Sequence, residues 1–171
     1  MNYYDEIANG YDELHSEEQL KKLEIIKQHF QPQKTDKLLD VGCGTGVSSL
    51  WDCKVYGVDS SEKLLEQFRD KVKDKKNYFI LQADAESLPF SDEEFDYVIS
   101  LTAIQNFDDI KKGIEEIRRV GKNNFALTFL KKSPKREEII DIIKGIFYDF
   151  ELKQIEEEKD IILVLKKSCF N

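Results

Sequence analysis

The sequence predicts an α/β fold in which helices cover both faces of a doubly wound, seven-stranded sheet. Two observations lead to this fold class. Short apolar segments alternate with amphipathic segments along the 171 residues, and that order is typical of a parallel sheet with right-handed crossovers. The last two apolar segments are separated only by the acidic stretch 156–158, which indicates a hairpin. We therefore expect a mostly parallel sheet with one antiparallel strand near the C-terminus.

The N-terminal part of the chain is expected to form a helix that leads into the sheet. Residues 16–30 carry apolar side chains at helical spacing, namely Leu20, Leu23, Ile26 and Phe30. Ser16 is the expected N-cap of this helix, because Gln19 stands at the capping-box position three residues later.

Predicted strands and helices then alternate. The strands are expected at residues 37–41, 54–58, 78–81, 95–100, 125–130, 150–155 and 160–167. Ser60 should cap the helix after the second strand, and Asp108 or Asp109 should start the helix after the fourth strand, which Gly121 ends. Ser133 is the expected N-cap of the last helix. The first two strands lie so close in sequence that only a turn or two of helix fits between them.

Length, composition and charge limit the classes of function that fit the chain. The length fits one domain over residues 1–171, with an N-terminal helical lid segment (1–33) and a core (34–171). A net charge of −8 disfavours generic nucleic-acid binding. The 2 His and 3 Cys are scattered, so we expect no metal site. The chain begins without the features of a signal peptide and contains no apolar run long enough to cross a bilayer, which predicts a cytoplasmic protein without membrane contact.

A glycine-rich loop follows the first predicted strand. It reads Asp40-Val41-Gly42-Cys43-Gly44-Thr45-Gly46, with glycines at alternate positions. Glycines allow a tight turn with no side chain blocking a ligand, and the turn presents backbone N–H groups. A helix N-terminus with its partial positive charge is expected to follow. Such a loop can hold a nucleotide, a carboxylate or a phosphate.

Two acidic residues follow the next two strands. Asp59 ends the second strand, where a carboxylate can accept both hydroxyls of a ribose. Asp84 follows the third strand, where a carboxylate can accept a hydrogen bond from an adenine amino group while a neighbouring backbone N–H donates to a ring nitrogen. Because the carboxyl ends of parallel strands meet at one edge of the sheet, the loop and both acids converge on one adenosine-shaped ligand.

These segments resemble the class I S-adenosylmethionine (SAM)-dependent methyltransferases. Residues 38–46 resemble the first motif of that family, 58–61 the second and 83–90 the third, and 95–100 resemble the strand that follows. Residues 4–12 are similar to the opening of the UbiE-like, or type 11, branch. The resemblance implies a Rossmann-like fold, SAM as the cofactor and methyl transfer as the activity.

The resemblance also implies cofactor-binding residues. Those that would lie against the methionine part of SAM are Asp40, Gly42, Gly44, Gly46, Ser100 and Leu101, with Asp40 holding the ammonium group. Those that would bind the adenosine part are Asp59, Ser60, Asp84 and Ala85. Tyr11, and with it Tyr4, would close over the cofactor from the N-terminal segment.

The residues that bind the methyl acceptor are less well defined. Gln105 and Asn106 follow the fourth strand, where their amides can orient an acceptor beside Phe107; the alternative is an ordinary loop that leads to a helix cap. Tyr11 is a further candidate on the acceptor side, and no general base can be named. One basic cluster, which could bind an anionic acceptor or lie in solvent, consists of Lys131, Lys132, Lys135 and Arg136.

Three hypotheses on function remain open. The first is methyl transfer to an unidentified small molecule, which the UbiE-like N-terminus favours. The second is methylation of tRNA or protein, with a small activator subunit, which the small size and the basic cluster favour. The third is a non-catalytic SAM-binding subunit. A dinucleotide oxidoreductase fits less well, because Val47 stands where the third glycine of the dinucleotide motif belongs.

Overall fold

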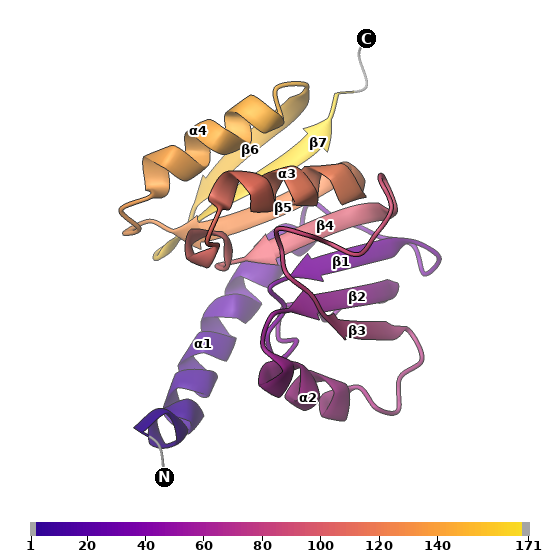
Figure 1. Cartoon of the computed structure of the whole chain (residues 1–171), viewed down its shortest axis with the longest axis vertical. Coiled ribbons are helices and arrows are strands. Elements are labelled where there is room, and N and C mark those ends of the chain that lie inside the picture. Colours follow the sequence, from indigo (N-terminus) through magenta and orange to yellow (C-terminus); the bar gives the residue numbers. More distant parts are fainter. Residues whose placement is uncertain (1–2, 169–171) are drawn as a thin grey trace.

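A computed structural model of the chain describes the backbone of residues 3–168 and the side chains of residues 15–168. Seven strands form one sheet in the order β3-β2-β1-β4-β5-β7-β6 (Figure 1). All neighbours are parallel except those of β7, which runs antiparallel to both β5 and β6. The predicted fold class is therefore confirmed. The strands are β1 (Lys37–Val41), β2 (Lys54–Asp59), β3 (Tyr78–Gln82), β4 (Phe95–Leu101), β5 (Gly121–Leu130), β6 (Phe150–Glu156) and β7 (Asp160–Lys167).

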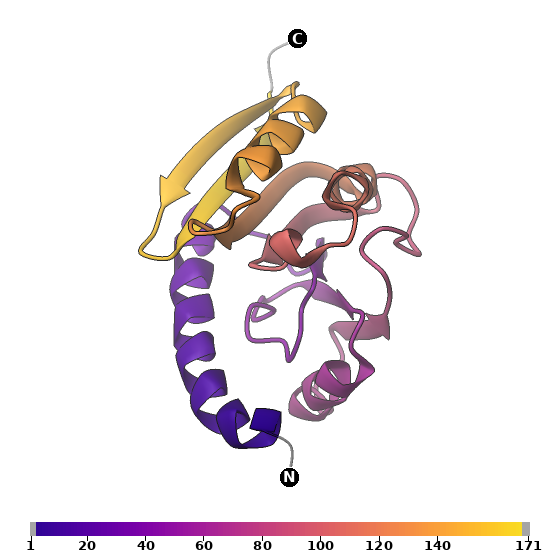
Figure 2. The ribbon, with the colours of Figure 1, turned by 60° about the vertical axis from the view of Figure 1, so that its left-hand side comes forward.

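Helices cover both faces of the sheet (Figures 1 and 2). They are α1 (Tyr3–Lys27), α2 (Glu62–Lys71), α3 (Ile110–Val120) and α4 (Arg136–Ile146), with a short 3-10 helix, η1 (Ile104–Asn106), after β4. Side chains alternate across the sheet, so Leu38 packs with α1 on one face while Leu39 packs with α3 and α4 on the other. Helix α2 lies on the α1 face, where Phe68 contacts Tyr78.

The first helix begins earlier than predicted. Helix α1 starts at Tyr3, so Ser16 lies inside it and the prediction that Ser16 is an N-cap is wrong. Residues 3–15 contain no proline, and a helix can pass through a capping-box pattern when the preceding residues are helical too. Leu23 and Ile26 are buried as predicted, and Phe30 is buried just past the end of α1, whereas Leu20 is exposed.

No helix connects β1 to β2, although a short one was predicted. Residues 42–53 form a series of turns, so no helix N-terminus points its dipole at the glycine loop. Side chains close this crossover instead. The Ser48 and Ser49 hydroxyls both donate to Asp40 Oδ2 at 2.7 Å, and Trp51 is buried with its indole N–H donating to the Ser48 carbonyl.

Three helix ends differ from the prediction in detail. Ser61 rather than Ser60 caps α2, and its hydroxyl accepts from the Leu64 N–H at 3.4 Å. Lys135 rather than Ser133 stands at the N-cap of α4. Gly121 follows α3 as predicted, but its φ of −103° is extended, because β5 begins at this residue. The expected cap of α3 is confirmed as Asp109.

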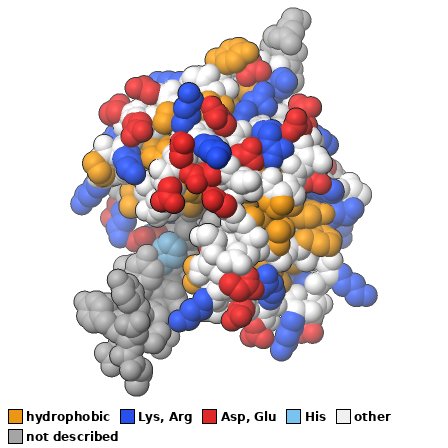
Figure 3. Space-filling view, in the orientation of Figure 1, with side chains coloured by type: hydrophobic (Ala, Val, Ile, Leu, Met, Phe, Trp, Pro, Cys, Tyr) orange, Lys and Arg blue, Asp and Glu red, His pale blue; other side chains and the backbone are white. Residues whose placement is uncertain are grey.

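The segment between β3 and β4 also lacks a helix, which leaves part of one sheet face uncovered. Tyr56 of β2 stacks on Phe79 of β3 with ring centroids 4.7 Å apart, and Phe79 is 43% exposed. Figure 3 shows exposed hydrophobic side chains on the side of the molecule where Figure 1 places β2 and β3. Since β3 is an edge strand, this apolar surface adjoins unpaired backbone.

Two further properties concern ligands and membranes. Within residues 15–168, no three His, Cys, Asp or Glu side chains come together as a metal site. None of the described helices combines the length and the apolar character that a membrane span requires.

Candidate active site

A cavity of about 520 Å³ opens at the carboxyl ends of β1, β2, β3 and β4. This is the edge at which doubly wound sheets bind ligands, and the volume lies in the range of small-molecule sites. The predicted site residues that line the cavity are Gly42, Gly44, Asp59, Ser60, Asp84, Ala85, Leu101 and Asn106. Parallel strands thus bring together the loop and the two acids that the sequence places far apart.

Four predicted site residues lie behind the cavity wall rather than in it. Gly46 has a φ of +86°, and a Cβ at this position would lie 2.1 Å from the ring of Phe68, so helix packing requires this glycine. The Ser100 hydroxyl is buried and donates to the Val41 carbonyl at 2.9 Å. Gln105 donates from its side-chain amide to the Thr102 carbonyl at 3.0 Å. Asp40 is the fourth, and the side chains of Tyr4 and Tyr11 lie outside the described residues.

Asp59 connects the glycine loop to helix α2. Its Oδ2 accepts from the Gly44 N–H and its Oδ1 accepts from the Ser61 N–H, each at 2.9 Å. A carboxylate has about four acceptor positions, so each oxygen of Asp59 can accept a further hydrogen bond. Gly42 must remain glycine here, because its φ is +76° and a Cβ would lie 2.6 Å from that of Ala103.

Asp84 shapes the turn after β3. Its Oδ1 accepts from the Glu86 N–H at 2.9 Å, and Asp84 and Ser87 form an isolated β-bridge. The Glu86 carboxylate in turn accepts from the N–H of Asp109, the cap of α3. The turn after β3 is thereby fixed to the helix that follows β4.

Asp40 is a buried carboxyl with one unpaired oxygen. Both serine hydroxyls donate to Oδ2, whereas Oδ1 has no hydrogen-bond partner among the described residues. Burial raises the pKa of Asp40 to about 6, although the bonds from Ser48 and Ser49 oppose the increase. Asp40 lies behind the cavity wall, and the charge of its ionised carboxyl attracts the ammonium group of an amino-acid ligand in the cavity. This observation, together with the two acids at the adjacent strand ends, shows that the site fits SAM.

Helix α1 supplies cavity residues that the sequence did not reveal as site residues. His15 and Gln19 line the cavity across from the segment that follows β4. Their spacing of four residues places them on one face of the helix. This spacing is the feature of the sequence that could have indicated that they line the same site. Thr45, Val47, Ser48 and Leu64 also line the cavity without having been predicted.

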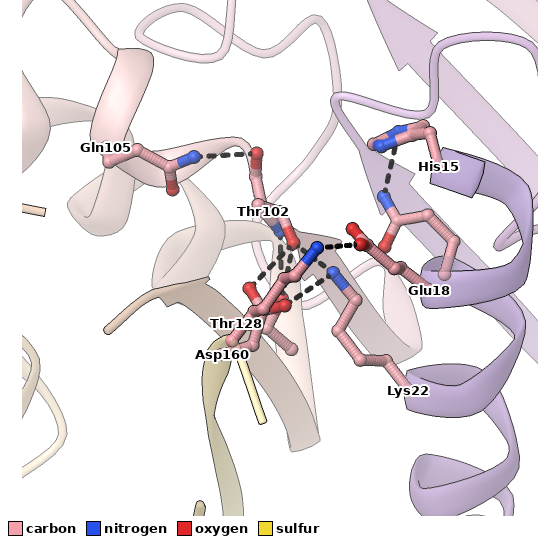
Figure 4. A network of polar contacts seen from close by, with 9 residues as sticks. His15, Glu18, Lys22, Thr102, Gln105, Thr128 and Asp160 are labelled. Carbon is pink, nitrogen blue, oxygen red and sulfur yellow. Dashed lines mark hydrogen bonds and ion pairs between the residues drawn. The ribbon is translucent and has the colours of Figure 1, made fainter. Parts of the chain in front are cut away.

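A buried polar network fixes α1 to the ends of three strands (Figure 4). The Lys22 ammonium donates to Asp160 Oδ2 at 3.0 Å and to Thr102 Oγ1 at 2.5 Å. The Lys22 and Asp160 side chains are each 2% exposed. Thr102 also donates its N–H to Thr128 Oγ1 at 2.8 Å and its hydroxyl to Asp160 Oδ1 at 3.1 Å. A second ion pair, Glu18–Lys159, lies beside the network.

The network holds Thr102 in an unusual backbone conformation. Thr102 has a φ of +54°, which is rare for a β-branched residue and persists only where the surroundings impose it. Thr102 lines the cavity and directly precedes the segment with Asn106 and Phe107. The position of that segment therefore depends on α1, on β5 through Thr128 and on β7 through Asp160.

The fold and site define a Rossmann-like enzyme with an adenosine-containing cofactor. The chain belongs to the methyltransferase domain family, which it matches over residues 39–129. It is 28% identical to demethylmenaquinone methyltransferase of Staphylococcus saprophyticus, over 98% of this chain and 78% of that protein. The chain is thus a SAM-dependent methyltransferase, and SAM is its cofactor.

Solved structures have the same fold. A SAM-dependent methyltransferase from Aquifex aeolicus has a TM-score of 0.70 and 20% identity, covering 85% of this chain and 89% of that one. A chain from a complex of the Haloferax volcanii Trm112 methyltransferase activator with a methyltransferase has a TM-score of 0.75 and 17% identity, covering 98% of each chain.

Proposed function

We propose that the chain transfers the methyl group of SAM to a small molecule. The observation that carries this proposal is that His15 and Gln19 of α1 line the same cavity as Asp59. Helix α1 therefore forms one wall of the cavity, and the cavity volume of about 520 Å³ lies in the range of small-molecule sites. The Staphylococcus saprophyticus relative is named for a small molecule, demethylmenaquinone, which supports the same acceptor class.

In this proposal different residues of the site bind different parts of SAM. Asp59 accepts the ribose hydroxyls, with Ser60 beside the adenine, and Asp84 and Ala85 bind the adenine edge. Gly42, Gly44 and Leu101 lie against the methionine part. Asp40 attracts the ammonium from behind the cavity wall through the negative charge of its ionised carboxyl. Gly46 and Ser100 act from behind the wall by fixing the loop and the end of β4, and Tyr11 closes over the cofactor.

The chemistry follows from this arrangement. When bound, SAM supplies a methyl group made electrophilic by its sulfonium. The chain aligns the acceptor atom with that methyl group and excludes water. Asn106 and Phe107 line the acceptor side, whereas Gln105 holds the Thr102 turn from behind. We assign no side chain as a general base.

Transfer of labelled methyl groups from SAM to a cell extract tests the proposal. The label is expected in molecules that pass a small-pore filter, and prior ribonuclease or protease treatment should leave its amount unchanged. Label retained above the filter and released by ribonuclease would assign the chain to RNA instead. Tight SAM binding without any transfer would favour the non-catalytic SAM-binding subunit.

The alternative with a small activator subunit is favoured by one observation. Phe79 is 43% exposed on the edge strand β3, and monomeric proteins rarely expose clustered aromatic residues. The Haloferax volcanii structure is of a complex with a methyltransferase activator. If this chain needs such a partner, the isolated protein should aggregate or fail to bind SAM. Monodisperse protein that binds SAM alone would contradict the alternative.

The basic cluster gives little support to an RNA acceptor. Lys131 and Arg136 both pair with the Glu156 carboxylate at 3.7 Å. Of the four basic residues, Lys132 and Lys135 therefore remain to bind an anionic acceptor. None of the four residues lines the cavity.

The cytoplasmic location expected from the sequence stays a prediction.

SAM affinity is expected to decrease at acidic pH because of Asp40. Its pKa of about 6 means that the carboxyl is neutral below that pH and ionised above it, whereas an α-ammonium stays charged up to about pH 7.7. Binding the ammonium requires the ionised form, so the dissociation constant of SAM should rise about tenfold from pH 7 to pH 5. Calorimetric titration across this range measures the change.

Asp40→Asn serves as the matched variant, since its amide oxygen still accepts from both serines. It should bind SAM more weakly at pH 7 and show no pH dependence from pH 5 to 7. Because the pKa of Asp40 lies above its ordinary 3.8, the native fold loses stability as pH rises from about 4 to 6. Asp40→Asn should therefore unfold at a higher urea concentration at pH 7. Unchanged pH dependence in the variant would assign the titration to another residue.

A further inference from the structure

One part of the cavity wall combines residues of α1 with residues that follow β4. It is formed by His15 and Gln19 of α1 and by the segment between β4 and α3, which contributes Asn106, Phe107 and Asp108. This wall combines a flat aromatic ring with amide and acidic groups. If the cavity holds SAM against the glycine loop, as proposed above, the acceptor approaches along this wall.

The charged residues that line the cavity are all acidic. They are Asp59, Asp84, Glu86 and Asp108, and no Lys or Arg is among the described lining residues. Lys22 lies behind Thr102, where its charge is already paired with Asp160. Like charges brought together in a partly buried site repel each other strongly. An acceptor that carries a carboxylate or phosphate would meet this repulsion without a Lys or Arg side chain among the described lining residues to offset it.

Gln19 supplies a specific polar contact in this wall. The residue is only 7% exposed and lines the cavity. One atom of its side-chain amide lies 3.5 Å from Nε2 of His15, while Oε1 has no hydrogen-bond partner among the described residues. A buried carbonyl oxygen left unpaired costs free energy. If the amide turns so that Oε1 faces the cavity, a bound molecule that donates a hydrogen bond to this oxygen would recover that free energy.

We infer that the methyl acceptor is a small molecule without negative charge that donates an N–H or O–H group to Gln19. This inference rests on the proposed function and narrows its acceptor class. Sites built to bind a donor group discriminate strongly against analogues that lack it, because their buried acceptor is then left unpaired. Asp108, exposed at the rim, adds attraction if the donor is a protonated amine.

Binding of small aromatic probes to protein saturated with S-adenosylhomocysteine tests the inference. Benzyl alcohol, benzylamine, toluene and benzoate share one ring and differ in donor and charge. Ligand-observed NMR titrations should show saturable binding of the alcohol and the amine, about tenfold weaker binding of toluene and none of benzoate. Gln19→Leu should reduce the alcohol and amine affinities to that of toluene and leave S-adenosylhomocysteine binding unchanged. Gln28→Leu, at an exposed position just past the end of α1, is the matched control.

The outcomes separate the inference from the proposed function. Benzylamine binding that weakens in Asp108→Asn would identify the donor as an amine, and stronger binding of benzyl alcohol would identify a hydroxyl; either result supports the inference. It is overturned if benzoate binds as well as benzyl alcohol, if no probe binds, or if Gln19→Leu leaves the alcohol affinity unchanged. Failure to bind S-adenosylhomocysteine would instead overturn the proposed function itself.

Discussion

Asp59→Ala is expected to weaken SAM binding by about a hundredfold or more. The substitution removes the proposed ribose contacts, which are charge-assisted and worth about 1.5–3 kcal/mol each. It also removes the acceptors of the Gly44 and Ser61 N–H groups, so the glycine loop loses its connection to α2. Calorimetric titration with SAM and with S-adenosylhomocysteine measures the loss, which should be similar for both because the two share the ribose.

Two controls separate binding from folding in this experiment. Asp52→Ala changes an exposed aspartate in the same crossover and should leave the SAM affinity within twofold, about the uncertainty of such measurements. Urea unfolding of Asp59→Ala should remain cooperative, since the residue lies at the edge of the cavity rather than in the core. If folded Asp59→Ala binds SAM as tightly as the parent protein, the ribose role implied by the family resemblance is wrong.

The sheet and the grouping of the glycine loop with Asp59 and Asp84 around one cavity could be predicted because their signals are local. A strand of apolar residues followed by alternating glycines constrains the backbone wherever it occurs, and Gly42, Gly44 and Gly46 all have positive φ. Asp59 and Asp84 each end or follow a strand, and parallel topology then brings them together. These inferences needed no knowledge of tertiary contacts.

The connection between β1 and β2 could not be predicted in the same way. Residues 42–53 were expected to include a short helix, but Ser48 and Ser49 bond to Asp40 and Trp51 fills the space beneath. Such buried polar contacts outweigh the local helix propensity only in the folded protein, where the surrounding core excludes water. The start of α1 was predicted wrongly for a different reason. The residues around Ser16 match the pattern of an N-cap, but the helix already begins at Tyr3, so Ser16 lies inside it.

The part of the cavity wall formed by α1 and by the segment after β4 depends on contacts between residues distant in sequence. Lys22 bonds to Thr102, 80 residues away, and to Asp160, 138 residues away. In the sequence Lys22 is one of three lysines on an amphipathic helix, where a solvated side chain is the ordinary expectation. Only the fold shows that this lysine is buried and that Gln19, three residues before it, lines the cavity.

Lys22→Met is expected to lower the free energy of unfolding by about 4 kcal/mol. Methionine fills much of the same space, but it leaves the Asp160 carboxylate buried at 2% exposure without its cation, and breaking a buried pair from one side costs about 3–5 kcal/mol. Such a loss is a large part of the stability of an ordinary domain. Urea unfolding followed by circular dichroism should show a lower midpoint with an unchanged slope.

The neighbouring lysine provides the control for this prediction. Lys21 is exposed on the same turn of α1, so Lys21→Met should change the free energy of unfolding by no more than about 0.5 kcal/mol. The double variant Lys22→Met with Asp160→Asn should regain part of the loss, because no unpaired charge then remains buried. Equal stability of the two lysine variants would mean that the pair contributes little. In that case Thr102 would owe its strained conformation to its contacts with Thr128 and Asp160 rather than to Lys22.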